Sequence, residues 1–560
     1  MKEVLIIGSG IAGMSCAVKC AELGLHVTLV SPFPSERAQS VMAAGGINAV
    51  RKNCEPGDSV ASHIEDTLKG GAYLAGKQAV TGLCESADDI LSMLEGIGTV
   101  FTTDQTGKPM RRAFGGQSYK RTHYAGAATG KVMVSALVME TRRYEAQGLI
   151  ERKLWSCFHS ALLKDGVCYG AMLYNEAIGS LEAVYADAVV VATGGQNALF
   201  GKTTGSSQCD GYTAGKLFMQ GALLKNLEFI QYHPTTLETS QKRMLISEAA
   251  RGEGGRLFYE KNGKRVYFME EKYGPQGNLK TRDVISREMY AIPEQVYLDI
   301  SFLDKKHIDE RLPEVRDLCR KYGNIDVYKE PIPVKPAVHF FMGGLAVHLN
   351  HETNLKNLFA VGECASMYHG ANRLGGNSLL AAVYSGRVAA EAIAKRFGSA
   401  GEESGSKPGA SGADTAQKPD FSKELAEEKE KLLRLRKTES NFPVQYIRDM
   451  LAESLEKHLG IVRDEEDLKE GLNDVDYLLS VAESIRYDNS VMAYFNYSLT
   501  GILTLAKAAL VSALSREESR GAHFRSDHPE TREDQAFATL ISYDGGRYTV
   551  SLDREHCYES

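Results

Sequence analysis

Two apolar runs separated by a helical pattern open the chain. Val4–Ile7 is continuously apolar, which predicts a buried strand. Apolar positions then recur with helical spacing from Met14 to Leu23, and a second, mostly apolar run covers Val27–Val30. Between the first run and the helical pattern, Gly8–Gly13 reads G-x-G-x-x-G. The pattern predicts a βαβ unit with a glycine-rich strand-to-helix turn.

Such a turn is typical of a dinucleotide site. The glycines allow the backbone to approach a pyrophosphate, and the helix N-terminus presents free N–H groups to it. An acidic residue that would bind a ribose hydroxyl of NAD is missing, because Ser31 and Pro32 follow the second strand. The turn therefore favours FAD over NAD. A glycine-rich turn in an ordinary α/β domain is the alternative.

Further apolar runs extend the same pattern. Residues 187–195 read DAVVVATGG and residues 357–363 read NLFAVGE, and both predict buried strands that end at one rim of a parallel sheet. Residues 421–515 have leucines and alanines at helical spacing, which predicts a short helical bundle. Apolar and polar residues alternate near residues 539–543 and 548–552, which predicts two strands in the tail.

We therefore expect a Rossmann-like α/β FAD-binding domain with an inserted α+β capping domain and a C-terminal helical bundle. The Gly/Ser/Ala/Pro-rich residues 398–419 have the composition of a flexible linker. The expected divisions are 1–222 and 343–397 for the two parts of the FAD-binding domain, 223–342 for the capping domain, 398–419 for the linker, 420–515 for the helical domain and 516–560 for the tail.

Composition narrows the classes of partner. The 560 residues are 43% hydrophobic and 24% charged, as in globular proteins, and the net charge of −7 gives no basic footprint for nucleic acid. The ten cysteines include no C-x-x-C pair, which favours reduced thiols over a disulfide framework or a metal cluster within the chain. The chain enters a strand within three residues and has no bilayer-length apolar run. We expect a cytoplasmic protein with no metal of its own.

Arginine and histidine recur in glycine-rich, apolar surroundings later in the chain. Singly, each has an ordinary structural explanation, but buried guanidiniums require anionic partners. Arg251 and Arg282 outnumber the nearby acids unless a ligand supplies negative charge, which predicts a pocket for a small dianion. The residues alone thus indicate a flavin oxidoreductase for an acidic small molecule. The clusters occupy residues 231–234, 247–255, 281–283, 337–344 and 369–379.

The same segments resemble the flavoprotein subunits of succinate dehydrogenase and fumarate reductase, whose relatives include L-aspartate oxidase and soluble fumarate reductases. The resemblance covers nearly the whole chain except residues 398–419. It is carried, in order, by GSGIAG, FGGQSYKRT, ATGG, QYHP, SEAARGEGG, TRD, HFFMGG, VGEC, HGANRLGGNSL and ESRGAH.

The resemblance implies a role for each matching position. Arg282 would donate a proton to the substrate double bond and would be resupplied through Glu248 and Arg251. Two substrate carboxylates would be held by His233, Ser247, His339 and Arg373, with Phe114 against the bond between them. The implied FAD contacts are Gly8, Gly10, Gly13, Ser31, Ser40, Gly45, Gly46, Asp210, Glu363, Asn377, Ser378 and Leu379.

Two positions depart from patterns in this family. Gln39 stands where many members have the histidine that tethers FAD, so we expect non-covalent FAD and a preference for fumarate reduction over succinate oxidation. Alternatively, Gln39 only fills space and a partner sets the direction. Phe114 stands where aspartate oxidases have a glutamate for the substrate ammonium group, which argues against an amino-acid substrate.

The leading hypothesis is therefore interconversion of fumarate and succinate. L-aspartate oxidase, a reductase of a related unsaturated dicarboxylic acid and a non-catalytic FAD-binding scaffold remain alternatives. The chain has no haem-attachment motif or cluster ligands, so the resemblance implies that an iron–sulfur subunit supplies electrons. A membrane anchor subunit would place the protein peripherally on the cytoplasmic face of the membrane.

Overall fold

A five-stranded parallel sheet, with strand order β19-β10-β1-β2-β6, forms the centre of the computed structural model. β1 and β10 are apolar throughout their buried length because both faces of the sheet are covered. The strands are β1 (Glu3–Ile7), β2 (His26–Ser31), β6 (Ile150–Leu154), β10 (Ala188–Val191) and β19 (Leu358–Ala360). The structure describes residues 2–52, 54–126, 128–240, 242–397, 418–435, 443–482 and 497–553.

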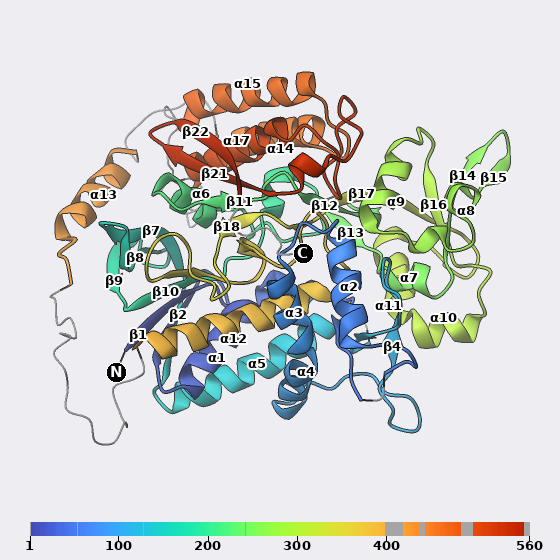
Figure 1. The fold of residues 1–560 in the computed structure, drawn as a ribbon, viewed down its shortest axis with the longest axis horizontal. Coiled ribbons are helices and arrows are strands. Elements are labelled where there is room, and N and C mark those ends of the chain that lie inside the picture. The colour runs from blue at the N-terminus through green and yellow to red at the C-terminus, as the bar shows by residue number, and fades with distance from the viewer. Residues whose placement is uncertain are drawn as a thin grey trace.

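Different layers cover the two faces of this sheet. Val4 and Ile6 belong to a core with helices α1 (Ile11–Glu22), α5 (Thr129–Ala146) and α12 (Asn377–Phe397), which lie side by side in Figure 1. Leu5 and Ile7 point to the opposite core, as strand alternation requires. The antiparallel strands β7 (Ser156–Lys164), β8 (Val167–Asn175) and β9 (Ser180–Tyr185) contribute to that second core.

A six-stranded sheet, with order β13-β12-β17-β16-β14-β15, is antiparallel throughout. It lies to one side of the parallel sheet in Figure 1. Its strands are β12 (Ile230–Glu238), β13 (Arg243–Leu245), β14 (Arg256–Lys261), β15 (Lys264–Val266), β16 (Val296–Asp299) and β17 (Ile332–Phe341). Its accompanying helices are α7 (Ala249–Gly252), α8 (Phe268–Tyr273), α9 (Arg282–Tyr290), α10 (Lys305–Arg311) and α11 (Pro313–Leu318).

The helices after the expected linker do not all join one bundle. α14 (Val444–His458), α15 (Glu465–Ala482) and α17 (Leu499–Ser515) pack together, as the leucine and alanine spacing predicts. α13 (Ser422–Leu435) instead lies against β9, apart from the other three in Figure 1. Of the expected linker, residues 398–417 lie outside the described residues.

Both predicted tail strands are confirmed, as β21 (Ala538–Asp544) and β22 (Arg547–Asp553). They join a sheet with β11 (Leu224–Lys225), β18 (Gly344–Ala346) and β20 (Ala365–Ser366). The start of the expected insertion thus pairs with the tail, and the antiparallel sheet begins only at Ile230. The remaining elements are α2 (Val60–Gly70), α3 (Lys77–Glu85), α4 (Ala87–Gly96), α6 (Tyr212–Met219) and the short strands β3 (Ile47–Asn48), β4 (Arg111–Arg112) and β5 (Thr122–His123).

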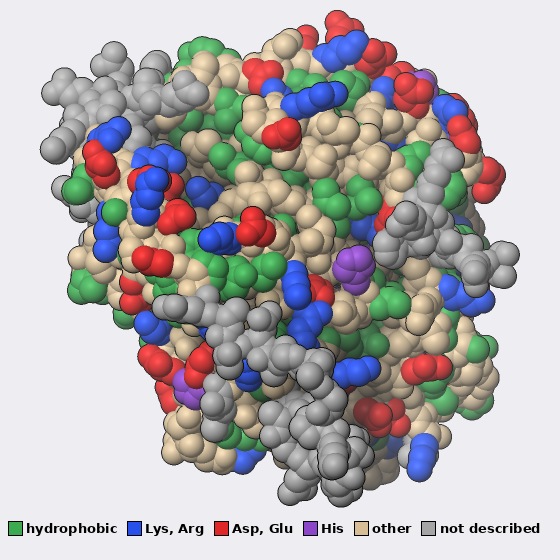
Figure 2. Space-filling model, turned by 60° about the vertical axis from the view of Figure 1, so that its left-hand side comes forward, with side chains coloured by type: hydrophobic (Ala, Val, Ile, Leu, Met, Phe, Trp, Pro, Cys, Tyr) green, Lys and Arg blue, Asp and Glu red, His purple; other side chains and the backbone are tan. Residues whose placement is uncertain are grey.

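Positive and negative side chains alternate over the face in Figure 2, and acidic side chains gather along its upper edge. Helix α15 lies along the upper edge of the molecule in Figure 1, and the turn about the vertical axis between the two views leaves its height unchanged. Nine described cysteines are free thiols, eight of them buried. Among the described residues, no helix combines the length and apolar character that crossing a bilayer requires.

Candidate active site

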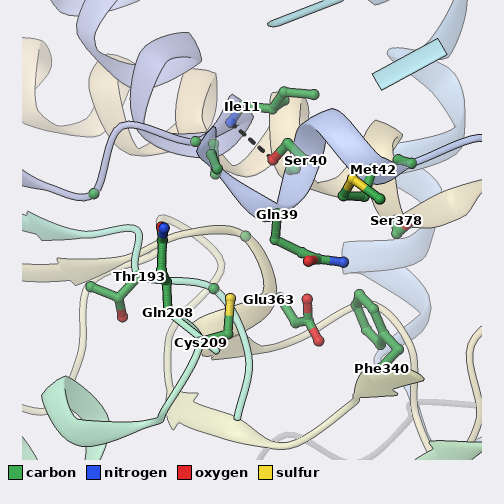
Figure 3. A pocket seen from close by; sticks show the side chains of 18 of the residues that line it. Ile11, Gln39, Ser40, Met42, Thr193, Gln208, Cys209, Phe340, Glu363 and Ser378 are labelled. Atoms are coloured by element: carbon green, nitrogen blue, oxygen red, sulfur yellow. Dashed lines mark hydrogen bonds between the residues drawn. The ribbon is translucent and has the colours of Figure 1, made fainter. Parts of the chain in front are cut away.

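A cavity of about 590 Å³ extends from the glycine-rich turn after β1 to the antiparallel sheet. Its size is that of a cofactor or ligand site. One end is lined by Gly8 and Gly10, and the other by His233, Arg282 and His339. Figure 3 shows Gln39 and Ser40 on one side and Cys209, Glu363 and Phe340 on the other. The fold therefore brings the predicted substrate residues and most of the predicted cofactor residues to one continuous space.

The glycine-rich turn has the geometry of a phosphate cradle. Gly8 has φ = +111°, and a Cβ there would lie 2.3 Å from the Ala192 carbonyl oxygen. A Cβ on Gly13 would lie 1.9 Å from the Gly8 carbonyl oxygen, so Gly13 packs α1 onto β1 and does not line the cavity. The N-cap residue of α1 is Gly10, which has no side chain to cap the helix, and no acidic residue occupies the first turn. These residues fit a dinucleotide pyrophosphate.

Most of the other implied FAD contacts also line the cavity. The Ser40 hydroxyl accepts a 3.3 Å hydrogen bond from the Ile11 N–H, drawn in Figure 3, while the Ser31 hydroxyl donates to the Phe33 carbonyl. Asn377 lies behind the wall, where Asn48, His63 and Thr67 bind its side chain. The lining contacts are Gly8, Gly10, Ser31, Ser40, Gly45, Gly46, Asp210, Glu363, Ser378 and Leu379.

Two carboxyl groups among the predicted FAD contacts, those of Glu363 and Asp210, line the cavity and are held in place by buried contacts. Glu363 accepts a 3.1 Å hydrogen bond from the Phe341 N–H, and burial raises the pKa of Glu363 to about 7. Burial also raises the pKa of Asp210, although Arg448 lies 3.5 Å away. A carboxyl group with a raised pKa can donate as well as accept hydrogen bonds, which suits a hydroxyl-bearing ligand.

Gln39 extends into the cavity between Met42 and Phe340 in Figure 3. It lies on a short 3₁₀ turn, and its Oε1 is buried without a hydrogen-bond partner among the described residues. A buried amide oxygen without a partner carries a desolvation cost that a ligand donor would remove. The amide has no nucleophilic ring nitrogen, so it cannot take the place of a tethering histidine.

Arg282, Glu248 and Arg251 form one buried array. Arg282 is the first residue of α9 and donates from Nε and Nη2 to Glu248 Oε2 at 2.9 and 2.7 Å. Glu248 Oε1 accepts from the Gly115 N–H at 2.7 Å and lies 3.5 Å from Arg251 Nη2. Burial opposes ionisation of Glu248, but the two guanidiniums outweigh it and lower its pKa to about 2. Burial lowers the pKa of Arg251.

The two histidines lie on neighbouring strands of the antiparallel sheet. His233 on β12 and His339 on β17 have ring centroids 5.2 Å apart. His339 Nδ1 lies 2.8 Å from the Thr204 hydroxyl, and His233 Nδ1 receives the Thr235 N–H at 3.3 Å. Burial and then the Arg282 charge lower both histidine pKa values well below their usual range. Both rings are therefore neutral near pH 7.

The other three predicted substrate residues also line the cavity. Arg373 lies over the Phe340 ring at 4.3 Å, and its Nε has no hydrogen-bond partner among the described residues. Burial lowers the pKa of Arg373 well below its usual range. Ser247 accepts from the Ala249 N–H at 3.3 Å, and Phe114 is 3% exposed with its ring facing Gly45. An anionic ligand would supply the partner that Arg373 lacks.

Gln231 is not among the predicted site residues, and the structure places it against Arg282. Gln231 Oε1 accepts from Arg282 Nη1 at 3.0 Å, and Gln231 Nε2 donates to Asn372 Oδ1 and the Arg373 carbonyl. The signal in the chain is an amide two residues before His233 in β12, and this amide is fully buried. Lys242 was also missed; it lines the cavity, and burial lowers its pKa.

Comparison with known proteins agrees with this arrangement. The FAD binding domain family matches residues 3–379, and the fumarate reductase flavoprotein C-terminal family matches residues 448–557. The succinate dehydrogenase flavoprotein subunit of Bacillus subtilis is 36% identical over 96% of this chain and 93% of the relative. One subunit of the fumarate reductase (CoM/CoB) of Methanothermobacter marburgensis is 34% identical over 96% of this chain and 97% of the relative.

Solved structures match across the same length. A quinol fumarate reductase flavoprotein of E. coli superposes with a TM-score of 0.90 at 29% identity, covering 100% of this chain and 97% of that one. An adenylylsulfate reductase of Archaeoglobus fulgidus, at 18% identity and a TM-score of 0.77, shares the fold. The cradle, the cavity and these relatives identify an FAD-dependent oxidoreductase. The chain belongs to the family of succinate dehydrogenase and fumarate reductase flavoprotein subunits.

Proposed function

We propose that this protein interconverts fumarate and succinate and favours fumarate reduction. The observation that carries the proposal is the positive excess at the substrate end of the cavity. Arg282 and Arg373 line this end together with Glu248 as an ionised carboxylate, and Arg251 is buried 3.5 Å from Glu248 without lining the cavity. Glu363 lies close enough to act on Arg373, but its pKa of about 7 leaves it only partly charged. A dicarboxylate dianion supplies the missing negative charge.

Each substrate-binding residue has a definite task in this proposal. Arg373 binds one substrate carboxylate, while the neutral His233 and His339 rings and the Ser247 hydroxyl donate to the other. Held at both ends, the substrate presents its C2–C3 bond to the flavin. When bound, FAD supplies or accepts a hydride at that bond. Phe114 packs on the apolar centre of the substrate and offers no partner to an ammonium group, which disfavours L-aspartate oxidase.

Arg282 is the proposed proton donor to the substrate carbon. A guanidinium can act as an acid only if its proton is replaced readily, and Glu248 accepts from it at 2.7 Å. Arg251 lies 3.5 Å from the other Glu248 oxygen, and burial favours loss of its proton. Glu248 and Arg251 therefore form a route by which Arg282 regains its proton.

We also propose that FAD is held without a covalent bond, because Gln39 cannot form one. The relatives are named as subunits, which supports a supply of electrons from a partner protein. By the resemblance, that partner is an iron–sulfur subunit, with a membrane anchor holding the complex at the cytoplasmic face. A reductase of a related unsaturated dicarboxylic acid would use the same charges and differ only in the apolar contact with Phe114.

The test is a substrate comparison on the purified, FAD-loaded protein. Reduced viologen serves as electron donor for fumarate, and an oxidising dye serves as acceptor for succinate. We expect turnover with both and a larger kcat for fumarate. Aspartate is assayed in parallel by peroxide release. Rapid aspartate oxidation without fumarate turnover would establish the oxidase alternative instead, and a larger kcat with succinate would reverse the proposed direction.

A further inference from the structure

A second polar cluster lies between α14 and α15, outside the residues that line the active-site cavity. His458 is the last residue of α14, and only 2% of its surface is exposed. A Cβ on Gly471 of α15 would lie 2.8 Å from the His458 Cβ. The glycine therefore allows the two helices to approach closely at the histidine.

Three carboxylates of α15 surround the His458 ring. Asp467, Glu470 and Asp474 are three and four residues apart, so they share one face of the helix. His458 Nδ1 lies 3.4 Å from Asp467 Oδ1, while Nε2 lies 3.9 Å from Glu470 Oε2 and 3.7 Å from Asp474 Oδ2. One donor atom each from His458, Asp467 and Glu470 fit within 4.8 Å of one another.

Buried polar atoms at this cluster lack the contacts that they need. His458 Nδ1 is buried without a hydrogen-bond partner among the described residues, and so is the Ser454 hydroxyl one helical turn earlier. Both residues line a cavity of about 260 Å³ together with Asp474 and Tyr477, and Asp467 and Glu470 are not among the lining residues of that cavity. An unpaired buried donor or acceptor is costly, so the buried His458 Nδ1 indicates a ligand that it shares with Asp467, whose Oδ1 lies 3.4 Å away.

The charge at the cluster favours a cation. Lys457 is the basic neighbour, and it binds Glu470 at 3.3 Å. Three carboxylates against one lysine leave an excess of negative charge around the ring. The C-terminal end of α14 adds its negative partial charge at the same place.

We propose that His458, Asp467 and Glu470 bind a divalent transition-metal ion of the zinc class. An imidazole nitrogen with carboxylate oxygens is a ligand set that such ions accept. Ligands at roughly 2.1 Å in a tetrahedron lie about 3.4 Å apart, which is the separation between His458 Nδ1 and Asp467 Oδ1. Glu470 is 53% exposed at its side chain, so it can rotate to complete the site.

The test uses the FAD-loaded protein after removal of metal by chelation. Equilibrium dialysis against Zn²⁺, with metal measured by atomic emission, gives the stoichiometry and Kd. Thermal unfolding with and without Zn²⁺ gives an independent readout. We expect one ion per chain and a higher Tm with Zn²⁺. In His458→Gln and Glu470→Gln the affinity should fall at least about tenfold.

Glu466→Gln is the matched control, because Glu466 is exposed on the same helix and its replacement removes the same charge as Glu470→Gln. This variant should bind Zn²⁺ as the unaltered protein does, and fumarate turnover should be unchanged in all three variants. Should His458→Gln fold poorly, Glu470→Gln still decides the matter, because Glu470 is exposed. No bound ion, or equal affinity in Glu466→Gln and Glu470→Gln, would show that His458 only forms ion pairs here.

Discussion

Replacing Glu248 with glutamine removes the carboxylate that both buried guanidiniums share. Arg282 donates to it at 2.9 and 2.7 Å, and Arg251 lies 3.5 Å from its second oxygen. Glutamine keeps the shape, and its carbonyl oxygen can still accept a hydrogen bond, but the charge is lost. The change therefore isolates the electrostatic part of the array.

The pKa of Glu248 sets the size of the effect. It lies at about 2 against an ordinary 4.5, a difference that corresponds to about 3 kcal/mol in favour of the ionised carboxylate. Because the pKa is lowered in the folded protein, this stabilisation is present above pH 4.5 and is lost as the pH falls toward 2. At pH 7 the free energy of unfolding of the Glu248→Gln protein should therefore be about 3 kcal/mol smaller than that of the unaltered protein. Its Tm should fall by several degrees.

Thermal unfolding of the FAD-loaded protein measures the stability, and viologen-linked fumarate turnover measures the activity. Loss of the proton route should lower kcat by about a hundredfold or more. Glu271→Gln on the exposed face of α8 removes the same charge without a buried partner, so its Tm should stay within about 1 °C. A Glu248→Gln protein with unaltered Tm and kcat would refute both the pairing energy and the relay.

Three further outcomes follow from the same geometry. Denaturation in acid should release all FAD into the supernatant, measured by its fluorescence, because Gln39 forms no covalent bond; flavin retained on the precipitated chain would contradict this. Gln231→Leu removes a hydrogen bond to Arg282 and should lower kcat for fumarate about tenfold, checked by steady-state kinetics, with an unchanged kcat arguing against a positioning role. Glu363→Gln should raise the Tm of the FAD-free protein at pH 8 but not at pH 4, because a carboxyl pKa raised to about 7 makes ionisation costly in the folded state; equal shifts at both pH values would exclude that cause.

The parts of the fold that the sequence could predict are those with a strong local pattern. The G-x-G-x-x-G turn and its flanking apolar runs form β1, α1 and β2, and the alternation in the tail forms β21 and β22. The placement of α13 could not be predicted, because its helical spacing does not say which surface its apolar side takes. That surface includes β9, and Phe421, the residue just before α13, lies near Tyr185 of β9 and Tyr169 of the neighbouring β8.

The residues of the candidate site also divide into those that a local sequence pattern predicts and those that it does not. His233, Glu248, Arg282 and His339 stand in distinctive clusters, and the structure brings them to one cavity. The contact between Gln231 and Arg282 joins residues 51 positions apart, so no local pattern contains it. Asn377 shows the converse: its position in a recognisable segment suggested a cofactor contact, but its side chain faces Asn48, His63 and Thr67. Its assigned role in FAD binding remains a prediction.

Fumarate turnover by an Arg282→Gln protein that still binds FAD tests the central claim most directly. Arg287→Gln is the matched control, because Arg287 lies on the same helix α9 and packs over Phe524 outside the cavity. With Arg282 as proton donor, kcat should fall to background in Arg282→Gln and stay near the unaltered value in Arg287→Gln. An Arg282→Gln protein that retained a tenth or more of the original kcat would contradict the account.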